Sequence, residues 1–275
     1  MVDTKDNLIF RISYELYVYF ILILQGYTLK DKLIIIIYFL TFPFRFLNKL
    51  IQKDYDRTFT YNVTIKNKDG LFFCDKSFNT CRIVSRHHER DIEEYFVLQE
   101  GDVFIDVGSH AGKYAIRLAR QIGNKGQVIA IEPEPYNFEI LKRNVELNNF
   151  RNIILQNIAC SDTNGDIKLY VDDKATTLHS IRKNSDIIGK EINVQTQKID
   201  TLLLNLNIDK VDLIKIDVEG AELEVLKGSI NTLQRCHPSI IYEAWNEEYQ
   251  KKIKKFLVKY NYSIKQINRT NYYAW

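Results

Sequence analysis

Glycines and acidic residues recur at short spacing where two apolar runs of this 275-residue chain end. The first run ends in Asp106-Val-Gly108-Ser-His-Ala-Gly112, and the second, after a stretch of helical character, ends at Glu132. A strand, a glycine turn, a helix and a second strand closed by an acid form the unit by which an α/β sheet binds an adenosine-containing cofactor. The glycines let the backbone and a helix N-terminus approach the ligand, and the acid binds the ribose hydroxyls.

The spacing of the glycines distinguishes between cofactors. A dinucleotide site uses G-x-G-x-x-G so that backbone amides cradle a pyrophosphate. Here Asp106, Gly108 and Gly112 form D-x-G-x-x-x-G instead. A carboxylate in this turn would repel pyrophosphate, but it suits a cationic group such as the amino group of S-adenosylmethionine. On this motif alone, the alternative is a parallel α/β sheet that needs glycine only for a close turn.

Further motifs along the chain give a specific resemblance, over roughly residues 95 to 245. They are Asp106-Val-Gly-Ser-His-Ala-Gly112, Ile131-Glu-Pro133, Asn144, Asn148, Asp217-Val-Glu-Gly-Ala-Glu222, Val225-Leu-Lys-Gly228 and Pro238-Ser-Ile-Ile-Tyr-Glu243. In this order and at these spacings the sequence resembles the FkbM family of S-adenosylmethionine-dependent methyltransferases, often O-methyltransferases of sugars or natural-product hydroxyls. It departs from the family at His110, where a smaller Asn is common, and in its apolar N-terminal segment, which the family does not require.

The resemblance and the strand ends together assign expected roles, because ligands of such sheets bind beyond the carboxyl ends of the strands. We expect Asp106 to face the methionine amino group, Glu132 to hold both ribose hydroxyls and Asp162 to meet the adenine amino group. His110 would contact the methionine carboxylate beside a helix N-terminus, or simply cap the turn. The expected cofactor-binding residues are Asp106, Gly108, His110, Gly112, Glu132, Pro133 and Asp162.

Methyl transfer is a displacement at a carbon that the sulfonium already activates, so alignment of the reactants can contribute as much as ~7–11 kcal/mol. A hydroxyl acceptor also loses a proton, which calls for a general base or a metal-bound alkoxide. The candidate catalytic residues are Asp217, Glu219, Glu243 and His179, the last in a polar loop where it could equally be an ordinary surface residue. Asp217 and Glu219 could instead hold a divalent cation; otherwise no metal is expected.

The order of the elements predicts an α/β fold of class I methyltransferase type. This is a Rossmann-like doubly wound sheet, mostly parallel, with a C-terminal antiparallel hairpin, preceded by an apolar and helical N-terminal segment. The expected domains are an apolar segment at 1–54, a lead-in at 55–100 and a methyltransferase domain at 101–275 with an insertion at about 161–210. Strands are predicted at 103–107, 127–131, 153–159, 166–171, 192–196, 213–218, 239–242, 263–267 and 272–275, and helices at 112–122, 135–148, 200–206, 221–233 and 247–260.

The first fifty residues contain two intensely apolar runs, 16–24 and 33–40. Each is shorter than the roughly 20 residues of a spanning helix, and charged residues at 30–32 separate them. The region could pack on the catalytic domain or on a partner subunit of a homo-oligomer, form a hairpin span, or lie in a membrane interface through residues 8–50. In the interfacial arrangement Arg45, Lys49 and Lys53 would face anionic lipid.

Net charge and the chain start set softer limits on location and partners. A net charge of +3 is too slight to indicate nucleic acid as a partner. Asp3 and Asp6 interrupt the basic start, and no small-residue cleavage site follows. We therefore expect a cytoplasmic protein, with membrane association left open.

The function that these observations favour is S-adenosylmethionine-dependent O-methylation of a hydroxyl on a saccharide or another polar metabolite. The alternatives are a protein or lipid-linked acceptor, and a non-catalytic scaffold that only binds the cofactor. Methyltransferases of base amino groups usually carry an Asn/Asp-Pro-Pro-aromatic motif after the fourth strand, where this chain has Asp217-Val-Glu-Gly220. The glycine spacing disfavours a nicotinamide dehydrogenase.

Overall fold

The computed structural model describes residues 8–42, 62–75, 78–85, 88–172, 179–180 and 189–275, with the backbone alone described for 8–11, 78–79, 172 and 179–180. The chain divides into two compact units, residues 1–88 and 89–275, which we describe separately. The predicted lead-in at 55–100 contributes residues to both units.

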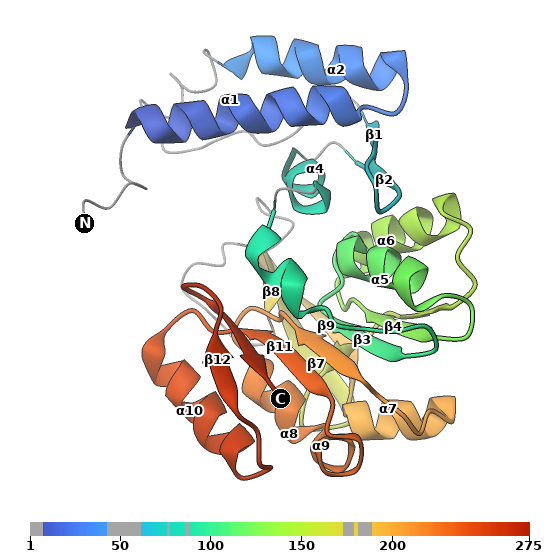
Figure 1. The fold of residues 1–275 in the computed structure, drawn as a ribbon, viewed down its shortest axis with the longest axis vertical. Coiled ribbons are helices and arrows are strands. Elements are labelled where there is room, and N and C mark those ends of the chain that lie inside the picture. The colour runs from blue at the N-terminus through green and yellow to red at the C-terminus, as the bar shows by residue number, and fades with distance from the viewer. Residues whose placement is uncertain (1–7, 43–61, 76–77, 86–87, 173–178, 181–188) are drawn as a thin grey trace. The chain divides into compact units, whose positions relative to one another are not determined.

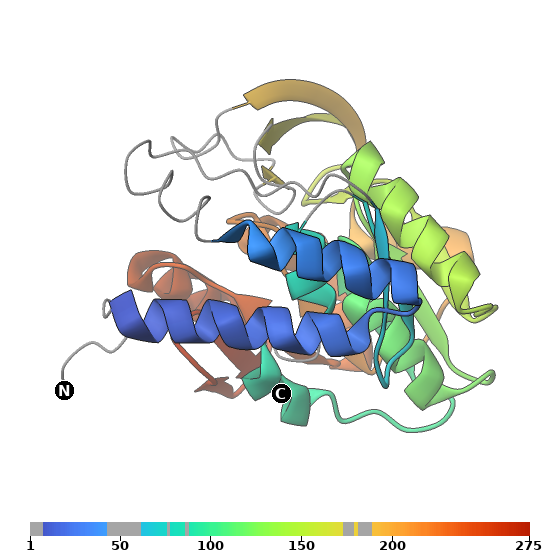
Figure 2. The ribbon, with the colours of Figure 1, turned by 90° about the horizontal axis from the view of Figure 1, so that it is seen from above.

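The N-terminal unit begins with two helices, α1 (Leu8–Gln25) and α2 (Leu29–Leu40), which lie side by side in Figures 1 and 2. The predicted helical character of this apolar segment is confirmed. α2 begins with a capping box in which Thr28 and Asp31 exchange backbone-to-side-chain hydrogen bonds. The other carboxylate oxygen of Asp31 accepts the N–H of Thr64 at 2.9 Å. This contact ties α2 to the antiparallel hairpin of β1 (Val63–Lys66) and β2 (Leu71–Cys74), which a short helix, α4 (Phe78–Val84), follows.

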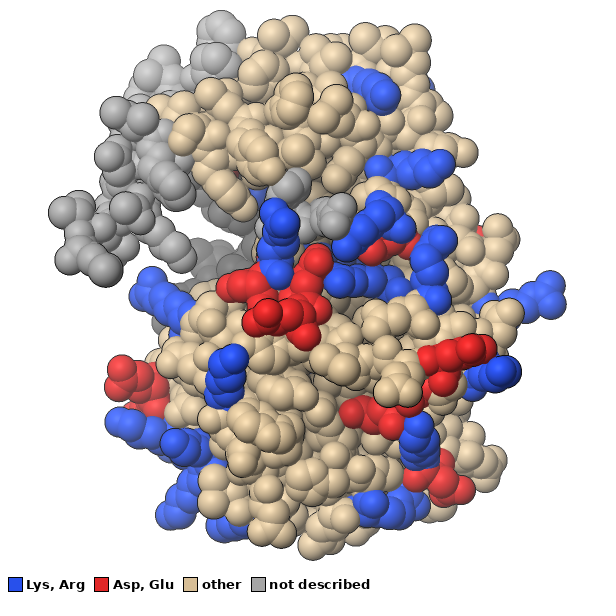
Figure 3. Space-filling view, viewed as in Figure 1, with Lys and Arg blue, Asp and Glu red and all other residues tan. Residues whose placement is uncertain are grey.

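Both long helices of this unit expose apolar stripes. In the view of Figure 3 their surface is largely uncharged. Exposed lysines lie in the first turn of α2 (Lys30) and on the β1–β2 hairpin (Lys66 and Lys68). A β-bridge between Gly26 and Ile65 joins the α1–α2 loop to this hairpin. None of the helices in the described ranges is long and apolar enough to cross a bilayer. The stripe residues are Tyr14, Tyr17, Phe20 and Leu24 on α1, and Leu29, Leu33, Ile37 and Leu40 on α2.

The second unit is built on a seven-stranded sheet in the order β12-β13-β11-β10-β3-β4-β5. The strands from β11 to β5 are parallel, and β13 and β12 are antiparallel at the edge. The strands are β3 (Val103–Val107), β4 (Gln127–Ile131), β5 (Ile153–Gln156), β10 (Leu213–Ile216), β11 (Ser239–Glu243), β12 (Ile264–Gln266) and β13 (Asn271–Ala274). The predicted doubly wound class I methyltransferase fold with its C-terminal hairpin is confirmed.

Helices cover both faces of this sheet, with α5 and α6 on one face and α7 to α9 on the other (Figure 1). Because both faces are covered, the parallel strands are largely apolar, and Ile105, Ile129, Ile214 and Ile240 are fully buried. The helical elements are η1 (Arg90–Tyr95), α5 (Lys113–Ile122), α6 (Pro135–Leu147), α7 (Ile199–Leu206), α8 (Glu222–Lys227), α9 (Ile230–Cys236) and α10 (Glu247–Val258).

The strand predicted at 153–159 is wrong as a single element. β5 pairs with β4 only as far as Gln156, and Ala159 and Cys160 form β6, which pairs with β9 in a second sheet. Between them, the side chain of Asn157 donates to the carbonyl of Glu132 at 2.8 Å and holds the chain at the point where it leaves the main sheet. The second sheet has the order β6-β9-β7-β8, and all of it except β6 lies within the predicted insertion. Its strands are β6 (Ala159–Cys160), β7 (Gly165–Asp172), β8 (His179–Ser180) and β9 (Gly189–Gln197).

The single helix predicted at 221–233 is also wrong, because the chain forms α8 and α9 with a break at Gly228. A Cβ on Gly228 would lie 2.0 Å from the carbonyl oxygen of Ser161, so the backbone packs directly on the loop after β6. A new N-terminus follows at once: the carboxylate of Asp200 accepts the N–H groups of Asn231 and Thr232 at 2.8 and 2.9 Å.

Candidate cofactor-binding and active site

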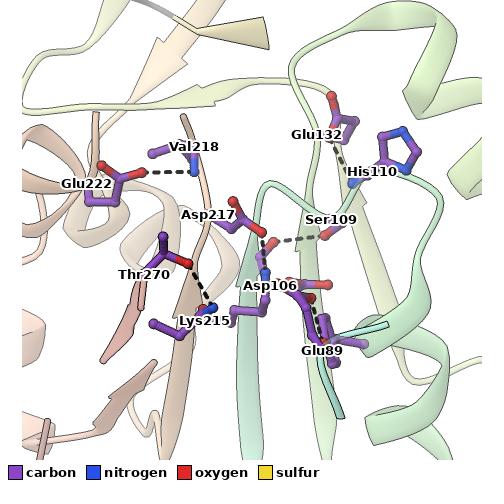
Figure 4. A network of polar contacts seen from close by, with 12 residues as sticks. Glu89, Asp106, Ser109, His110, Glu132, Lys215, Asp217, Val218, Glu222 and Thr270 are labelled. Carbon is purple, nitrogen blue, oxygen red and sulfur yellow. Dashed lines mark hydrogen bonds and ion pairs between the residues drawn. The ribbon is translucent and has the colours of Figure 1, made fainter. Parts of the chain in front are cut away.

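The carboxyl ends of β3, β4, β10 and β11 meet at one edge of the sheet, as parallel strands require. Each end carries a predicted site residue: Asp106, Glu132, Asp217 and Glu243. In Figure 4, Asp106, Lys215 and Asp217 point toward one another, and Glu132 lies on the neighbouring turn. The structure therefore brings acids from separate parts of the sequence to one place.

Two glycines shape the turn between β3 and α5, where Gly108 and Gly112 have φ of 87° and 86°. A Cβ on Gly108 would lie 1.9 Å from the carbonyl oxygen of Asp217, and one on Gly112 would lie 2.7 Å from Leu141 Cδ1. The Gly108 N–H also donates to the carbonyl of Ile131 at 3.0 Å. Only glycine combines this close approach with this backbone conformation.

The Glu132 carboxylate is buried beside this turn and is held by two backbone donors. Its Oε2 accepts the N–H of His110 at 2.9 Å and its Oε1 accepts the N–H of Glu134 at 3.0 Å. Burial raises the pKa of Glu132 to about 7, although these two N–H donors oppose the rise. Since each oxygen has a further lone pair, the group is oriented and can still accept hydrogen bonds from a diol.

Asp106 is the most unusual acid of the site, because it is only 1% exposed. Within the described part of the chain, neither carboxylate oxygen accepts a well-aligned hydrogen bond, although Ser109 and the N–H of Ala115 lie close enough to lower the pKa of Asp106. Burial raises its pKa to about 6, against the opposing charge of Lys215. A buried carboxylate without such partners is costly unless a ligand compensates for it, and a cationic ligand would do so.

The loop after β10 leaves the strand earlier than the predicted end at residue 218. β10 ends at Ile216 because Glu219 and Gly220 adopt φ of 54° and 100° and turn the chain. Glu222, which the sequence did not single out as a site residue, is buried and holds this turn. Its Oε1 accepts the N–H of Val218 at 3.3 Å (Figure 4) and the N–H of Gly220 at 3.0 Å.

Three acids named as catalytic candidates come together here, since one carboxylate oxygen each of Asp217, Glu219 and Glu243 lies within 4.8 Å of the others. Burial, and then the charge of Asp217, raise the pKa of Glu219 to about 8 and that of Glu243 to about 9. The nearby side chain of Trp245 opposes the rise in the pKa of Glu219. Glu219 and Glu243 are therefore protonated at neutral pH.

Lys215 is a residue of this site that the sequence analysis missed. Its side chain is only 4% exposed, and its Nζ lies 2.8 Å from Asp217 Oδ2. It stands directly opposite Asp106 in the pairing of β10 with β3. Burial alone would lower its pKa, but the carboxylates of Asp217, Glu89 and Asp106 raise it, so Lys215 is a permanent ammonium. The available signal was a lysine within an otherwise apolar strand, two residues before Asp217 and hence on the same face.

An aromatic ring lies against this ammonium. The ring of Tyr114 is 5.0 Å from the Lys215 Nζ and 4.8 Å from the Lys113 Nζ. Its hydroxyl donates to Glu89 Oε2 at 2.7 Å, and its ring stacks on Phe96. Tyr114, itself held by Glu89 and Phe96, thereby packs against the ammonium of Lys215.

The remaining predicted site residues lie outside the carboxylate cluster. Pro133 follows Glu132, and its carbonyl accepts the side-chain N–H of Asn157 at 3.2 Å. Asp162 is half-buried in the loop between β6 and β7. His179 lies in β8, paired with Val171, and its side chain is outside the described atoms.

The residues present fit S-adenosylmethionine. The site combines a buried acid that lacks well-aligned partners (Asp106), a backbone approach that a Cβ at Gly108 would block, and an oriented acid at the next strand end (Glu132). These suit an ammonium group, the body of the cofactor and a ribose diol respectively. Fold and site together define a class I methyltransferase.

Comparison with known proteins identifies the family. Residues 106–264, more than half of the chain, match the family described as "Methyltransferase FkbM domain". The chain belongs to this family.

Individual relatives match over about half of the chain. The hexuronic acid methyltransferase AglP of Haloferax volcanii is 33% identical over 144 residues, 52% of this chain and 56% of AglP. The 2-O-methyltransferase NoeI of Sinorhizobium fredii is 29% identical over 161 residues, 53% of this chain and 64% of NoeI. "Methyltransferase 1" of Beauveria bassiana is 27% identical over 142 residues, 45% and 57% of the two chains. The chain thus spans less than two thirds of the length of each of these relatives.

Among solved structures, the methyltransferase FkbM of Methylobacillus flagellatus superposes with a TM-score of 0.50. It is 15% identical, and the match covers 96% of this chain and 60% of that one. At this identity the likeness concerns the fold alone.

Proposed function

We propose that this protein transfers the methyl group of S-adenosylmethionine to a hydroxyl oxygen of a saccharide or a similarly polar acceptor. The observation that carries the proposal is the cluster of Asp217, Glu219 and Glu243 beside the glycine turn. A hydroxyl loses its proton on methylation and therefore needs a proton acceptor within hydrogen-bonding reach. The name of one relative, a hexuronic acid methyltransferase, supports a sugar as the acceptor, and the name of another, a 2-O-methyltransferase, supports an oxygen as the methylated atom.

For the cofactor, we assign Asp106 to the methionine ammonium and Glu132 to the ribose diol. Gly108 and Gly112 keep the turn open to close approach, and the N-terminus of α5 with His110 faces the methionine carboxylate. The loop residues Pro133 and Asp162 are assigned to the ribose and adenine end. The bound cofactor supplies a methyl group on a positively charged sulfur, which leaves as a neutral thioether.

For the acceptor proton, we assign Asp217 as the base. The ammonium of Lys215, 2.8 Å away, favours its ionised form. Glu219 and Glu243, with pKa values raised to about 8 and about 9, are protonated at neutral pH and can donate hydrogen bonds to the acceptor or to Asp217. The hydroxyl proton then passes to Asp217 as the oxygen–methyl bond forms. His179 remains a second candidate for this role.

A divalent cation at Asp217 and Glu219 is the less favoured arrangement. The ammonium of Lys215 already lies where a cation would have to pair with Asp217. We therefore expect methyl transfer to survive treatment with EDTA. A loss of turnover that Mg²⁺ or Mn²⁺ restores would support the metal-bound alkoxide instead.

The first test is calorimetric titration of the full chain with S-adenosylhomocysteine, beside a Glu132→Ala variant. Micromolar binding that the variant loses would support the cofactor assignment. No binding by folded wild-type protein would overturn it. Binding without methyl transfer to any acceptor would favour the non-catalytic scaffold.

The second test identifies the acceptor and the bond. Labelled S-adenosylmethionine would be offered to neutral sugars, uronic acids, lipid-linked glycans and protein. A labelled product that resists mild alkali is a methyl ether, as proposed, whereas an alkali-labile product is a methyl ester of a carboxylate. Labelling of protein alone would refute the saccharide assignment.

A further inference from the structure

Trp245 is a large aromatic residue that remains in solvent next to the site. It is 60% exposed and follows directly on Glu243 and the buried Ala244 at the end of β11. It is one of only two tryptophans in the chain. A single exposed aromatic is ordinary on a protein surface, so its significance depends on what surrounds it.

The backbone on both sides of Trp245 is fixed without help from the indole. The N–H of Ala244 donates to the carbonyl of Thr270 at 2.8 Å. Asn246 caps α10 by accepting the N–H of Tyr249 at 2.8 Å, and the hydroxyl of Tyr249 accepts the N–H of Leu223 at 3.0 Å. The backbone position of Trp245 is therefore fixed, while most of its side chain stays in solvent.

The indole of Trp245 borders the carboxylate cluster, because Trp245 lies two residues after Glu243 at the end of β11 and is close enough to Glu219 to lower the pKa of that acid. Glu219 in turn lies within 4.8 Å of Asp217 and Glu243. A flat apolar ring thus borders groups that accept and donate hydrogen bonds. A pyranose presents the complementary surface, because its axial C–H bonds form an apolar face and its hydroxyls form a polar rim.

We propose that Trp245 is the stacking platform of the acceptor subsite, on which a pyranose ring lies while its hydroxyl reaches Asp217 and Glu219. This inference rests on the proposed function, because it assigns the acceptor of the same site. It narrows that acceptor to a sugar ring, as opposed to an acyclic hydroxyl or a protein side chain.

Direct binding can be measured by fluorescence, because a Trp275→Phe variant leaves Trp245 as the sole tryptophan. The full-length variant, saturated with S-adenosylhomocysteine, would be titrated with methyl α-D-glucopyranoside and with glucuronic acid. Glycerol is the control, since it has hydroxyls without a ring face. We expect a saturable change in emission with at least one sugar and none with glycerol. A Trp245→Phe variant, which retains Trp275, should give no change.

A kinetic measurement separates this inference from the proposed function. Trp245→Ala should raise KM for the saccharide acceptor by about threefold to tenfold, the worth of one aromatic contact. Trp245→Tyr should restore most of this loss, and affinity for S-adenosylhomocysteine should stay within about twofold in both. If the wild type binds the cofactor analogue and transfers methyl groups but Trp245→Ala leaves KM unchanged, the inference fails alone. Absence of any sugar-dependent change in Trp275→Phe emission would also overturn it. Failure of the wild type to bind the analogue would overturn the proposed function itself.

Discussion

Replacing Lys215 by methionine removes the ammonium that lies between Asp106 and Asp217. Asp217 Oδ2 lies 2.8 Å from its Nζ, and Asp106 stands directly opposite it in the neighbouring strand. Methionine retains the apolar stem, so the variant tests the charge and not the packing. Lys215→Arg is the partner variant, since it keeps the charge while changing its shape.

The size of the effect follows from the burial of the pair. Breaking a buried ion pair by removing one partner costs about 3–5 kcal/mol. We expect the low end, about 3 kcal/mol, because the Asp217 side chain is 26% exposed and water can partly compensate. Turnover at pH 7 should fall by at least about 100-fold, the usual contribution of a general base. It should partly recover at higher pH, because the acids without the ammonium hold their protons more tightly.

Urea unfolding and the pH profile of methyl transfer measure these two effects. Lys227→Met is the matched control, since Lys227 is exposed, and it should leave both unchanged. A folded Lys215→Met protein with wild-type turnover at every pH would refute the role of Lys215 in keeping Asp217 ionised. A large loss of stability with an unchanged pH profile would mean that Lys215 is purely structural.

Three further outcomes are expected. Gly108→Ala should abolish binding of S-adenosylhomocysteine and destabilise the fold by more than about 3 kcal/mol, because the added Cβ would lie 1.9 Å from the carbonyl oxygen of Asp217 at a residue with φ of 87°. Unchanged affinity for S-adenosylhomocysteine in calorimetric titration would contradict this prediction. The pKa values of Asp106, Glu132 and Glu219 are raised to about 6, about 7 and about 8, so the folded state binds more protons than the unfolded chain. The unfolding free energy of the ligand-free protein should therefore fall as the pH rises from the ordinary pKa values of these groups to about 8. Urea titrations that give a flat or rising profile in this range would refute the assignment. The apolar stripes of α1 and α2, with the nearby exposed lysines, should bind the full chain more tightly to phosphatidylglycerol vesicles than to phosphatidylcholine vesicles. A variant with both Leu24→Glu and Ile37→Glu should no longer sediment with vesicles. Dimerisation of the wild type without vesicle binding would favour a second copy of the chain as the partner.

The bounds of strands and helices were predicted best where a single physical constraint sets both the first and the last residue of the element. The strands at 103–107 and 127–131 are found at the predicted bounds, because strands covered on both faces are largely apolar and these two are followed directly by Gly108 and Glu132. The helix after Pro135 begins where proline suits a first turn. The ends of parallel strands also converge, so the meeting of Asp217, Glu219 and Glu243 could be anticipated from strand order alone.

The predicted bounds of elements were wrong where they depend on a contact with a distant part of the chain, which the hydrophobic pattern does not reveal. Residues 153–159 read as one apolar strand, but hydrophobicity does not tell which strand a residue pairs with, and the chain changes sheets after Gln156. The break at Gly228 depends on the approach of the Ser161 carbonyl from 67 residues earlier in the chain. Contacts of that kind depend on tertiary packing, which overrides local propensity.

The charge balance of the site also depends on a contact between distant parts of the chain, that of Lys215 with Asp106 on the neighbouring strand. This contact connects cofactor binding with deprotonation of the acceptor in the proposed reaction. Lys215 lies opposite Asp106 through strand register and beside Asp217 through strand alternation, so one ammonium serves the acid assigned to the cofactor and the acid assigned to the acceptor. A single positive charge cannot fully compensate two carboxylates. The cationic methionine end of a bound cofactor would satisfy Asp106 and leave Lys215 to Asp217. On this argument cofactor binding prepares the base. Affinity for the acceptor should therefore be higher in the presence of S-adenosylhomocysteine than in its absence. Equal or higher affinity in its absence would refute the argument.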